Sequence, residues 1–237
     1  MSIRENYERI QEQIASACAA CGRKPEEVTL VAVTKFVPTE RIAPALDLGI
    51  THVGENRAQE LADKLDFFIK HKCDIHFIGQ LQTNKVKYII GRVDLVQSVD
   101  RIQLAQELER LAVQRNIVQN ILVQVNIGAE PQKGGIDEHN LSEFLHAMSD
   151  KPSLRVMGLM CVPPAVEAEE ARPYFARMRR LWEASKHIPG VTMQHLSMGM
   201  SGDYTAAIQE GATMIRLGSA LFGERPPHTV LQTGLYT

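Results

Sequence analysis

The sequence predicts an α/β fold, a single (β/α)8 TIM-type barrel with an extra N-terminal helix. Short apolar, β-branched runs alternate with segments of helical periodicity eight times along the chain. The length of 237 residues is close to the ~250 residues of such barrels. No linker-like stretch divides the chain, so we expect one domain over residues 1–237. A doubly wound open sheet is the alternative, because alternation alone does not show that the sheet closes.

The elements follow from the position of each apolar run. Apolar side chains at three- and four-residue spacings predict an amphipathic helix over residues 2–21, with Gly22 after its end. Strands are expected at 28–34, 50–53, 74–78, 92–97, 120–127, 154–160, 192–196 and 213–217. Helices are expected at 38–48, 56–70, 83–90, 100–114, 137–149, 167–186 and 201–210, with a last one starting at 220.

Composition and charge exclude several classes of protein. The formal net charge of -2 gives no global basic excess for nucleic acid or an anionic membrane. No apolar stretch approaches the roughly 20 residues that span a bilayer, and no signal-peptide core follows the charged N-terminus. The four cysteines are too few for a disulfide scaffold, and Cys18 and Cys21 have zinc spacing but no second pair. We therefore expect a cytoplasmic protein with reduced thiols and no metal site.

A lysine follows the first buried strand directly. Lys35 comes after the apolar run 30–34, and functional groups of a barrel lie at the C-terminal ends of its strands. A partly desolvated lysine there loses some preference for its charged form and can attack an aldehyde to form a Schiff base. The alternative is a strand-end lysine that extends to solvent.

The last two strands precede segments typical of a phosphate site. Ser201 lies between Gly199 and Gly202, and Gly218 and Ser219 follow the final strand. Barrels often bind phosphate at these two strand ends, through loop amides and a helix N-terminus. We expect Ser201 to cap its helix and also to offer a hydroxyl to an anion. The alternative is that these residues only cap helices and turn the chain.

Two further cations need partners. Arg216 lies one step inside the final strand, where an unpaired guanidinium is costly, and a heteroaromatic ring nitrogen would accept from it. Lys85 falls in the first turn of an expected helix, where a cation opposes the helix dipole. A ligand anion, or a carboxylate such as Glu55 or Glu130, would compensate for it.

Four motifs together resemble one family over nearly the whole chain. They are the segments 33–35, 54–60, 76–85 and 195–223, and they look like the pyridoxal phosphate homeostasis protein family (YggS/PROSC-like). The departures are mild: Thr34 stands where serine is common, and residues 161–164 differ from those that often follow the sixth strand. The resemblance implies a barrel similar to the N-terminal domain of alanine racemase, with pyridoxal 5'-phosphate (PLP) as cofactor.

The resemblance also implies roles for individual residues. It implies that Lys35 carries the cofactor as a Schiff base and that Arg216 faces the ring nitrogen. It implies that the phosphate is held by Ser201, Gly218 and Ser219. It also implies that the pocket is lined by Asn56 and by Met198 or Met200, and that Lys133 is a second lysine able to accept PLP. Arginine at the ring nitrogen makes PLP a weak electron sink, which limits carbanion chemistry.

These roles favour a protein that stores, buffers or delivers PLP to apoenzymes without a dedicated reaction. We expect a monomer, because no long apolar stripe is left over. The alternative is an amino acid racemase that uses Tyr204, His195 or Lys133 as its second base. Against it, the chain ends too soon for the additional β-domain that supplies this base in alanine racemase. A third hypothesis is a Schiff-base aldolase acting on a phosphorylated sugar.

Overall fold

Eight parallel strands close into a barrel in the computed structural model, which describes residues 1–223. Each strand pairs with the next one along the chain, and the last pairs with the first. The strands are β1 (Thr29–Val33), β2 (His52–Glu55), β3 (Asp74–Phe77), β4 (Leu95–Val99), β5 (Gln119–Val125), β6 (Leu154–Cys161), β7 (Val191–Ser197) and β8 (Met214–Leu217). The closed barrel confirms the expected fold class and removes the open-sheet alternative.

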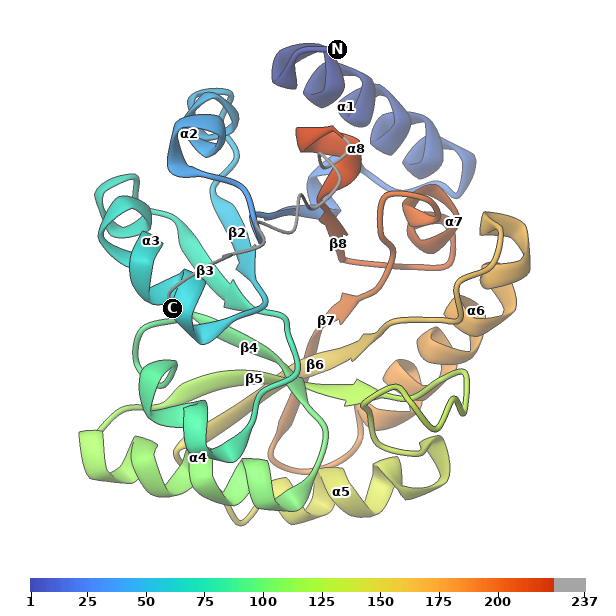
Figure 1. Ribbon diagram of the computed structural model, residues 1–237. Helices are drawn as coiled ribbons and strands as arrows, with labels where there is room; N and C mark the ends of the chain where they lie inside the picture. The colour runs from blue at the N-terminus through green and yellow to red at the C-terminus, as the bar shows by residue number, and fades with distance from the viewer. Residues whose placement is uncertain (224–237) are drawn as a thin grey trace, which may run out of the picture.

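Helices surround the barrel, as Figure 1 shows. They are α1 (Ile3–Ala20), α2 (Thr39–Asp47), α3 (Ala58–Lys70), α4 (Ile102–Arg115), α5 (Leu141–Met148), α6 (Ala168–Ser185), α7 (Tyr204–Gln209) and α8 (Ser219–Phe222), with short 3-10 helices η1 (Pro25–Glu27), η2 (Thr83–Tyr88) and η3 (Glu138–Asn140). The predicted N-terminal helix is confirmed as α1, which Ser2 caps. It lies beside α7 and α8 in Figure 1, and the Asn6 side chain donates to the carbonyl of Leu221 in α8 at 3.0 Å.

Several predicted elements need correction. The strand expected at 50–53 lies at His52–Glu55, and the helix expected from 137 starts as η3 and continues as α5 only from Leu141. Three further elements differ in type or start. The segment expected as an α-helix at 83–90 is the 3-10 helix η2, which starts with a bond from the Lys85 amide to the Gln82 carbonyl. Strand β4 begins at Leu95 rather than at 92, because the chain first turns and Asp94 accepts from the Ile75 amide. Helix α7 begins three residues after Ser201, since residues 200–203 form a turn closed by the Asp203 carboxylate on the Met200 amide at 2.6 Å.

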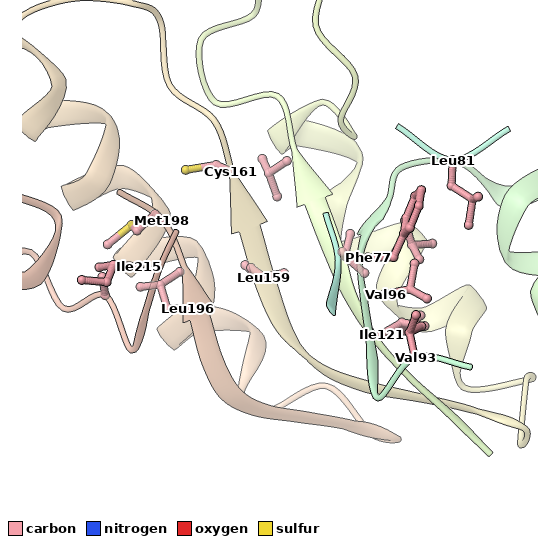
Figure 2. Close-up of a cluster of buried hydrophobic side chains, with 14 of the residues drawn as sticks. Phe77, Leu81, Val93, Val96, Ile121, Leu159, Cys161, Leu196, Met198 and Ile215 are labelled. Atoms are coloured by element: carbon pink, nitrogen blue, oxygen red, sulfur yellow. The ribbon is translucent and has the colours of Figure 1, made fainter. Parts of the chain in front are cut away.

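The main hydrophobic core lies between the barrel and its helices. Figure 2 shows part of it, with Phe77 and Ile121 on one side of the barrel and Leu196 and Ile215 on another. A smaller apolar cluster lies apart from it, formed by Leu95, Leu122, Met160 and Met214. Several buried polar side chains of the strands lie outside both clusters, among them His76, Gln97, Ser197 and Arg216.

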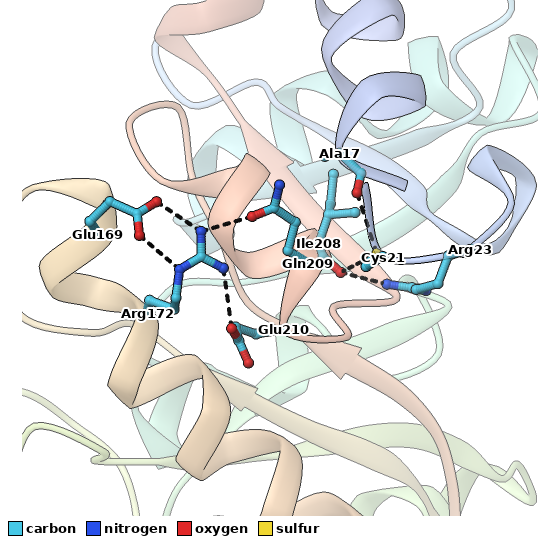
Figure 3. A network of polar contacts seen from close by, with 8 residues as sticks. All are labelled: Ala17, Cys21, Arg23, Glu169, Arg172, Ile208, Gln209 and Glu210. Atoms are coloured by element: carbon cyan, nitrogen blue, oxygen red, sulfur yellow. Dashed lines mark hydrogen bonds and ion pairs between the residues drawn. The ribbon is translucent and has the colours of Figure 1, made fainter. Parts of the chain in front are cut away.

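Arginine side chains hold α7 in place. Arg172 of α6 forms ion pairs with Glu169 and Glu210, and it donates to Gln209 (Figure 3). Arg23 donates to the carbonyls of Ile208 and Ala212 at 2.9 and 2.8 Å. These contacts fix the segment between β7 and β8.

Replacing Arg23 with Met is expected to lower the free energy of unfolding by about 1–3 kcal/mol, because two partly buried carbonyls lose their donor. Urea denaturation measures the change. The matched control is Arg110→Met, an exposed arginine that pairs with Glu107, for which a change within about 0.5 kcal/mol is expected. Equal losses in the two variants would contradict this role of Arg23.

No helix within residues 1–223 is long and apolar enough to cross a membrane. The four cysteines are all free thiols; Cys18 is buried in the last turn of α1 and Cys21 is the exposed residue that caps it. The glycine expected after this helix has a positive φ, and the amides of Gly22 and Arg23 bond back to Ala19 and Cys18, as in a glycine-terminated helix. Among the described residues, no group of three or more potential ligands could hold a metal ion.

Candidate functional site at the C-terminal ends of the strands

The ends of β7, β8 and β1 lie side by side. Register pairs Arg216 of β8 with Val31 of β1, and the Arg216 amide donates to the carbonyl of Gly199 beyond β7 at 3.0 Å. The Ala220 amide donates to the Ser201 hydroxyl at 3.1 Å, which joins the loop after β7 to the start of α8. The structure therefore brings Ser201 next to Gly218 and Ser219, as the sequence predicts. Ser201 does not cap α7, however, because Asp203 occupies that position.

Lys35 lies in a tight turn just beyond β1. The Thr34 carbonyl accepts from the Val37 amide at 3.0 Å, and Phe36 has a φ of 61°. A positive φ is unfavourable for a phenylalanine and persists only where neighbouring groups hold the backbone. Gly218 packs against Val33, so the turn that carries Lys35 lies at the same edge as the predicted phosphate loops.

A buried ion pair lies directly beneath this turn. The Lys64 ammonium contacts the Glu55 carboxylate at 2.8 Å and donates to the Thr34 carbonyl at 2.7 Å. The Thr34 hydroxyl donates to the same carboxylate at 2.6 Å. Burial raises the pKa of Glu55, while the hydrogen bonds from Lys64 and Thr34 act against that rise. Glu60, 3.6 Å from the Lys64 ammonium, accepts from the Phe36 amide at 2.7 Å.

Arg216 is buried, with 4% of its surface exposed, and is anchored by two of its nitrogen atoms. It donates to the Ser197 hydroxyl at 2.6 Å and to the Cys161 carbonyl at 2.8 Å. Burial lowers the pKa of the guanidinium, but arginine stays protonated in proteins. The side chain is thus a fixed cation inside the barrel, next to the predicted phosphate loops.

A chain of hydrogen bonds continues from Arg216 through the barrel interior. The Ser197 hydroxyl donates to the Gln97 carbonyl oxygen at 2.7 Å, and the Gln97 amide group lies 2.7 Å from His76 Nδ1. His76 Nε2 lies 3.1 Å from His52 Nδ1. Because the amide nitrogen donates to Nδ1, neutral His76 carries its proton on Nε2 and donates it to His52.

The His76 side chain predicts how stability depends on pH. Burial, with smaller contributions from His52 and His195, lowers the pKa of His76 from 6.5 to about 3. The unfolded chain therefore binds the extra proton between those values, so stability is complete above pH 6.5 and falls as the pH decreases. We expect His76 to account for a loss of about 3 kcal/mol between neutral pH and pH 4. Urea unfolding as a function of pH measures it, and a His76→Gln variant with an equally steep acid loss would contradict this assignment.

The other predicted residues lie at different depths. Asn56 follows β2, and its Oδ1 is buried without a hydrogen-bond partner among residues 1–223. It packs so closely on Gly79 that a Cβ at that glycine would lie 2.1 Å from the Asn56 carbonyl oxygen. Met198 is fully buried in the main core (Figure 2), whereas Met200 is 37% exposed.

The three residues considered as a racemase base are held in other contacts. The Tyr204 hydroxyl donates to Gln13 of α1, in the helical layer. His195 lies two residues before the end of β7, near His52, and burial lowers its pKa. Lys133 pairs with Glu130 and donates to the Pro163 carbonyl at 2.8 Å.

The carboxylates expected to compensate Lys85 are engaged elsewhere. Glu55 pairs with Lys64, and Glu130 pairs with Lys133. The Lys85 ammonium instead lies 5.6 Å from the centre of the Tyr88 ring. Both residues line a cavity of about 600 Å³ between α3, η2 and the end of β3.

Sequence reasoning missed Lys64, Glu60, Gln97 and Ser197 as parts of the site. A weak signal existed for the first two, because their spacing of four residues places them on one face of a helix that follows a strand end. No local pattern marks Gln97 or Ser197, whose partners lie up to 117 residues away.

The chain matches a family model described as "Alanine racemase, N-terminal domain" over residues 2–226. It is 43% identical to the pyridoxal phosphate homeostasis protein of Aquifex aeolicus, covering 95% of this chain and 99% of that protein. It is 38% identical to the protein of the same name from Escherichia coli K12, covering 94% and 97%.

Solved structures agree with these sequence matches. PipY of Synechococcus elongatus, determined with PLP bound, superposes with a TM-score of 0.77 at 34% identity, covering 89% of this chain and 100% of that chain. Alanine racemase of Corynebacterium glutamicum superposes with a TM-score of 0.67 at 17% identity, covering 96% of this chain but 64% of the enzyme, which shows the fold alone. The family match and these identities assign the chain to the pyridoxal phosphate homeostasis proteins, within the alanine racemase N-terminal domain family.

Proposed function

We propose that this protein binds PLP as a Schiff base on Lys35 and acts in PLP homeostasis, by storing, buffering or delivering the cofactor. The observation that carries the proposal is the convergence at one barrel edge of the Lys35 turn, the loop joined through Ser201 and Ala220, and buried Arg216. A relative at 34% identity has been solved with PLP bound. Names of the curated relatives describe homeostasis rather than a reaction.

The residues at this edge fit the chemistry of PLP. Bound PLP supplies an aldehyde, which reacts with a primary amine, together with a phosphate and a ring nitrogen. The Lys35 amine is the nucleophile. Ser201, Gly218 and Ser219 offer a hydroxyl pair and loop amides to the phosphate. A Cβ placed on neighbouring Gly202 would meet no atom of the described residues within 4 Å apart from its chain neighbours, so space is open there. Asn56, whose buried Oδ1 accepts from no donor in the described part of the chain, would line the pocket with Met198 or Met200.

Arg216 determines which chemistry the pocket favours. Its guanidinium is held rigidly by Ser197 and Cys161 and remains protonated. With PLP bound, the guanidinium would donate a hydrogen bond to the ring nitrogen and would disfavour protonation of that nitrogen. The ring then withdraws electrons weakly, which suits a protein that holds PLP without transforming a substrate.

Further parts of the proposal concern partners and location. We infer a single domain over residues 1–237 that works as a monomer in the cytoplasm and passes PLP to apoenzymes, with Lys133 as a secondary acceptor of the cofactor.

Delivery and catalysis are separated by one experiment. The PLP-loaded protein is mixed with a PLP-dependent apoenzyme, whose recovered activity reports transfer, and in parallel with free L- and D-amino acids, whose interconversion reports racemisation. We expect transfer to the apoenzyme and negligible amino acid turnover. Amino acid turnover that is lost in Lys35→Ala would instead support a racemase.

A further inference from the structure

Helix α3 holds both peptide groups that flank Lys35. The carbonyl of the Thr34–Lys35 peptide accepts from the Lys64 ammonium at 2.7 Å, and the amide of the Lys35–Phe36 peptide donates to the Glu60 carboxylate at 2.7 Å. These two bonds restrain the backbone on each side of the Lys35 α-carbon. Glu60 and Lys64 lie four residues apart, on one face of α3, and their charged groups are 3.6 Å apart.

A third contact comes from the residue that caps α3. The Arg57 guanidinium lies over the Phe36 ring, 4.7 Å from its centre. Phe36 is the residue with the unfavourable positive φ, so α3 contacts it through both its amide and its ring. The helix itself is fixed, because Leu61 and Phe68 are buried in the main core.

The Lys64 contacts exceed what a simple core ion pair requires. One carboxylate would neutralise the ammonium, yet its three protons have three acceptors around them, on Glu55, Thr34 and Glu60. A lysine is costly to bury. Both of its carboxylate partners also contact the Lys35 turn: Glu55 accepts from the Thr34 hydroxyl, and Glu60 accepts from the Phe36 amide.

We propose that Lys64 and Glu60 are positioning residues for Lys35: from one face of α3 they fix the backbone on both sides of it, so that its amine is presented to a carbonyl compound in one orientation. The inference rests on the proposed function of Lys35.

The test measures the turn and the capture of PLP separately. Hydrogen exchange of the Phe36 amide, followed by NMR without PLP, reports whether the turn is held. The rate at which borohydride-stable PLP accumulates on the Lys35 peptide reports whether the amine is positioned. Both are measured in the full-length protein.

The variants separate charge, hydrogen bonding and folding. Glu60→Ala removes the acceptor of the Phe36 amide, and Glu60→Gln retains an acceptor without the charge. A double variant, Lys64→Met with Glu55→Gln, removes the clamp on Thr34 without leaving a buried carboxylate unpaired. Lys70→Met, at the exposed end of the same helix, is the matched control.

Glu60→Ala and the double variant are expected to slow capture at Lys35 by roughly 10-fold or more, because a displaced nucleophile loses its productive geometry. Glu60→Ala should also speed hydrogen exchange of the Phe36 amide. Compared with Glu60→Ala, Glu60→Gln should restore part of the capture rate and part of the protection of this amide. Lys70→Met should stay within about twofold of the wild type.

Two results would overturn the inference in distinguishable ways. Capture at the wild-type rate in Glu60→Ala and in the double variant would mean that α3 does not position Lys35, with the proposed function intact. A wild-type protein that captures no PLP on Lys35 would remove the proposed function itself, and the positioning role with it.

Discussion

A Lys35→Ala variant is expected to lose the visible absorbance of bound PLP and to yield no PLP-modified peptide from residues around position 35 after borohydride reduction. The reason is chemical: among the groups at this barrel edge, the Lys35 amine is the proposed nucleophile for the PLP aldehyde. The Ser201 loop and Arg216 keep their own contacts without it. We therefore expect the variant to fold and to retain weak, non-covalent binding.

The control for this prediction is Lys70→Ala, which removes an exposed lysine from α3 and should leave the spectrum unchanged. If Lys133 is a secondary acceptor, borohydride reduction of the Lys35→Ala variant with excess PLP should modify Lys133 and leave Lys70 unmodified. An unchanged spectrum and full labelling in Lys35→Ala would contradict the assignment of the cofactor lysine.

Replacing Lys64 with Met is expected to lower the free energy of unfolding by roughly 3–5 kcal/mol. The substitution leaves the Glu55 carboxylate, whose side chain is fully buried, without its cation. Breaking a buried pair on one side costs more than the pair contributes, because the remaining charge has neither water nor a counterion. Adding Glu55→Gln should recover part of the loss, since the neutral amide needs no counterion.

The loss in Lys64→Met should depend on pH. Burial raises the pKa of Glu55 and the Lys64 hydrogen bond opposes that rise, so removing Lys64 raises the pKa further. A carboxyl whose folded pKa lies above its unfolded value binds more protons when folded, and stability then falls as the pH rises through that interval. Urea unfolding should show a smaller deficit at about pH 5 than at about pH 8. An identical loss of stability at the two pH values would contradict the buried-charge explanation.

The alternation of apolar runs was enough to predict nearly every element of the fold, because each strand buries one short stretch of sequence. Closure of the sheet was not predictable in the same way, since it depends on pairing between β1 and β8, almost 200 residues apart. The predicted start of α7 was wrong for a local reason. Asp203 closes a turn over residues 200–203, which competes with the helix that Ser201 was expected to cap.

Some residues of the candidate site could be predicted from the sequence and others could not. Lys35, Ser201, Gly218 and Arg216 could be named from sequence because each follows or ends a strand, and the barrel topology brings strand ends together. Lys64 could not, because it faces the core from the middle of a helix and its role depends on Glu55 and Thr34. The partners of Arg216 were equally hidden, since Ser197 and Cys161 belong to two other strands.

The most direct test of the account is the mass spectrum of peptides from the wild-type protein, reduced with borohydride after PLP loading. We expect a protein that absorbs visible light before reduction, and a single predominant modified peptide in which the PLP mass lies on Lys35. A protein that stays colourless with PLP, or one modified mainly at exposed lysines with Lys35 untouched, would contradict the claim that this edge of the barrel holds the cofactor.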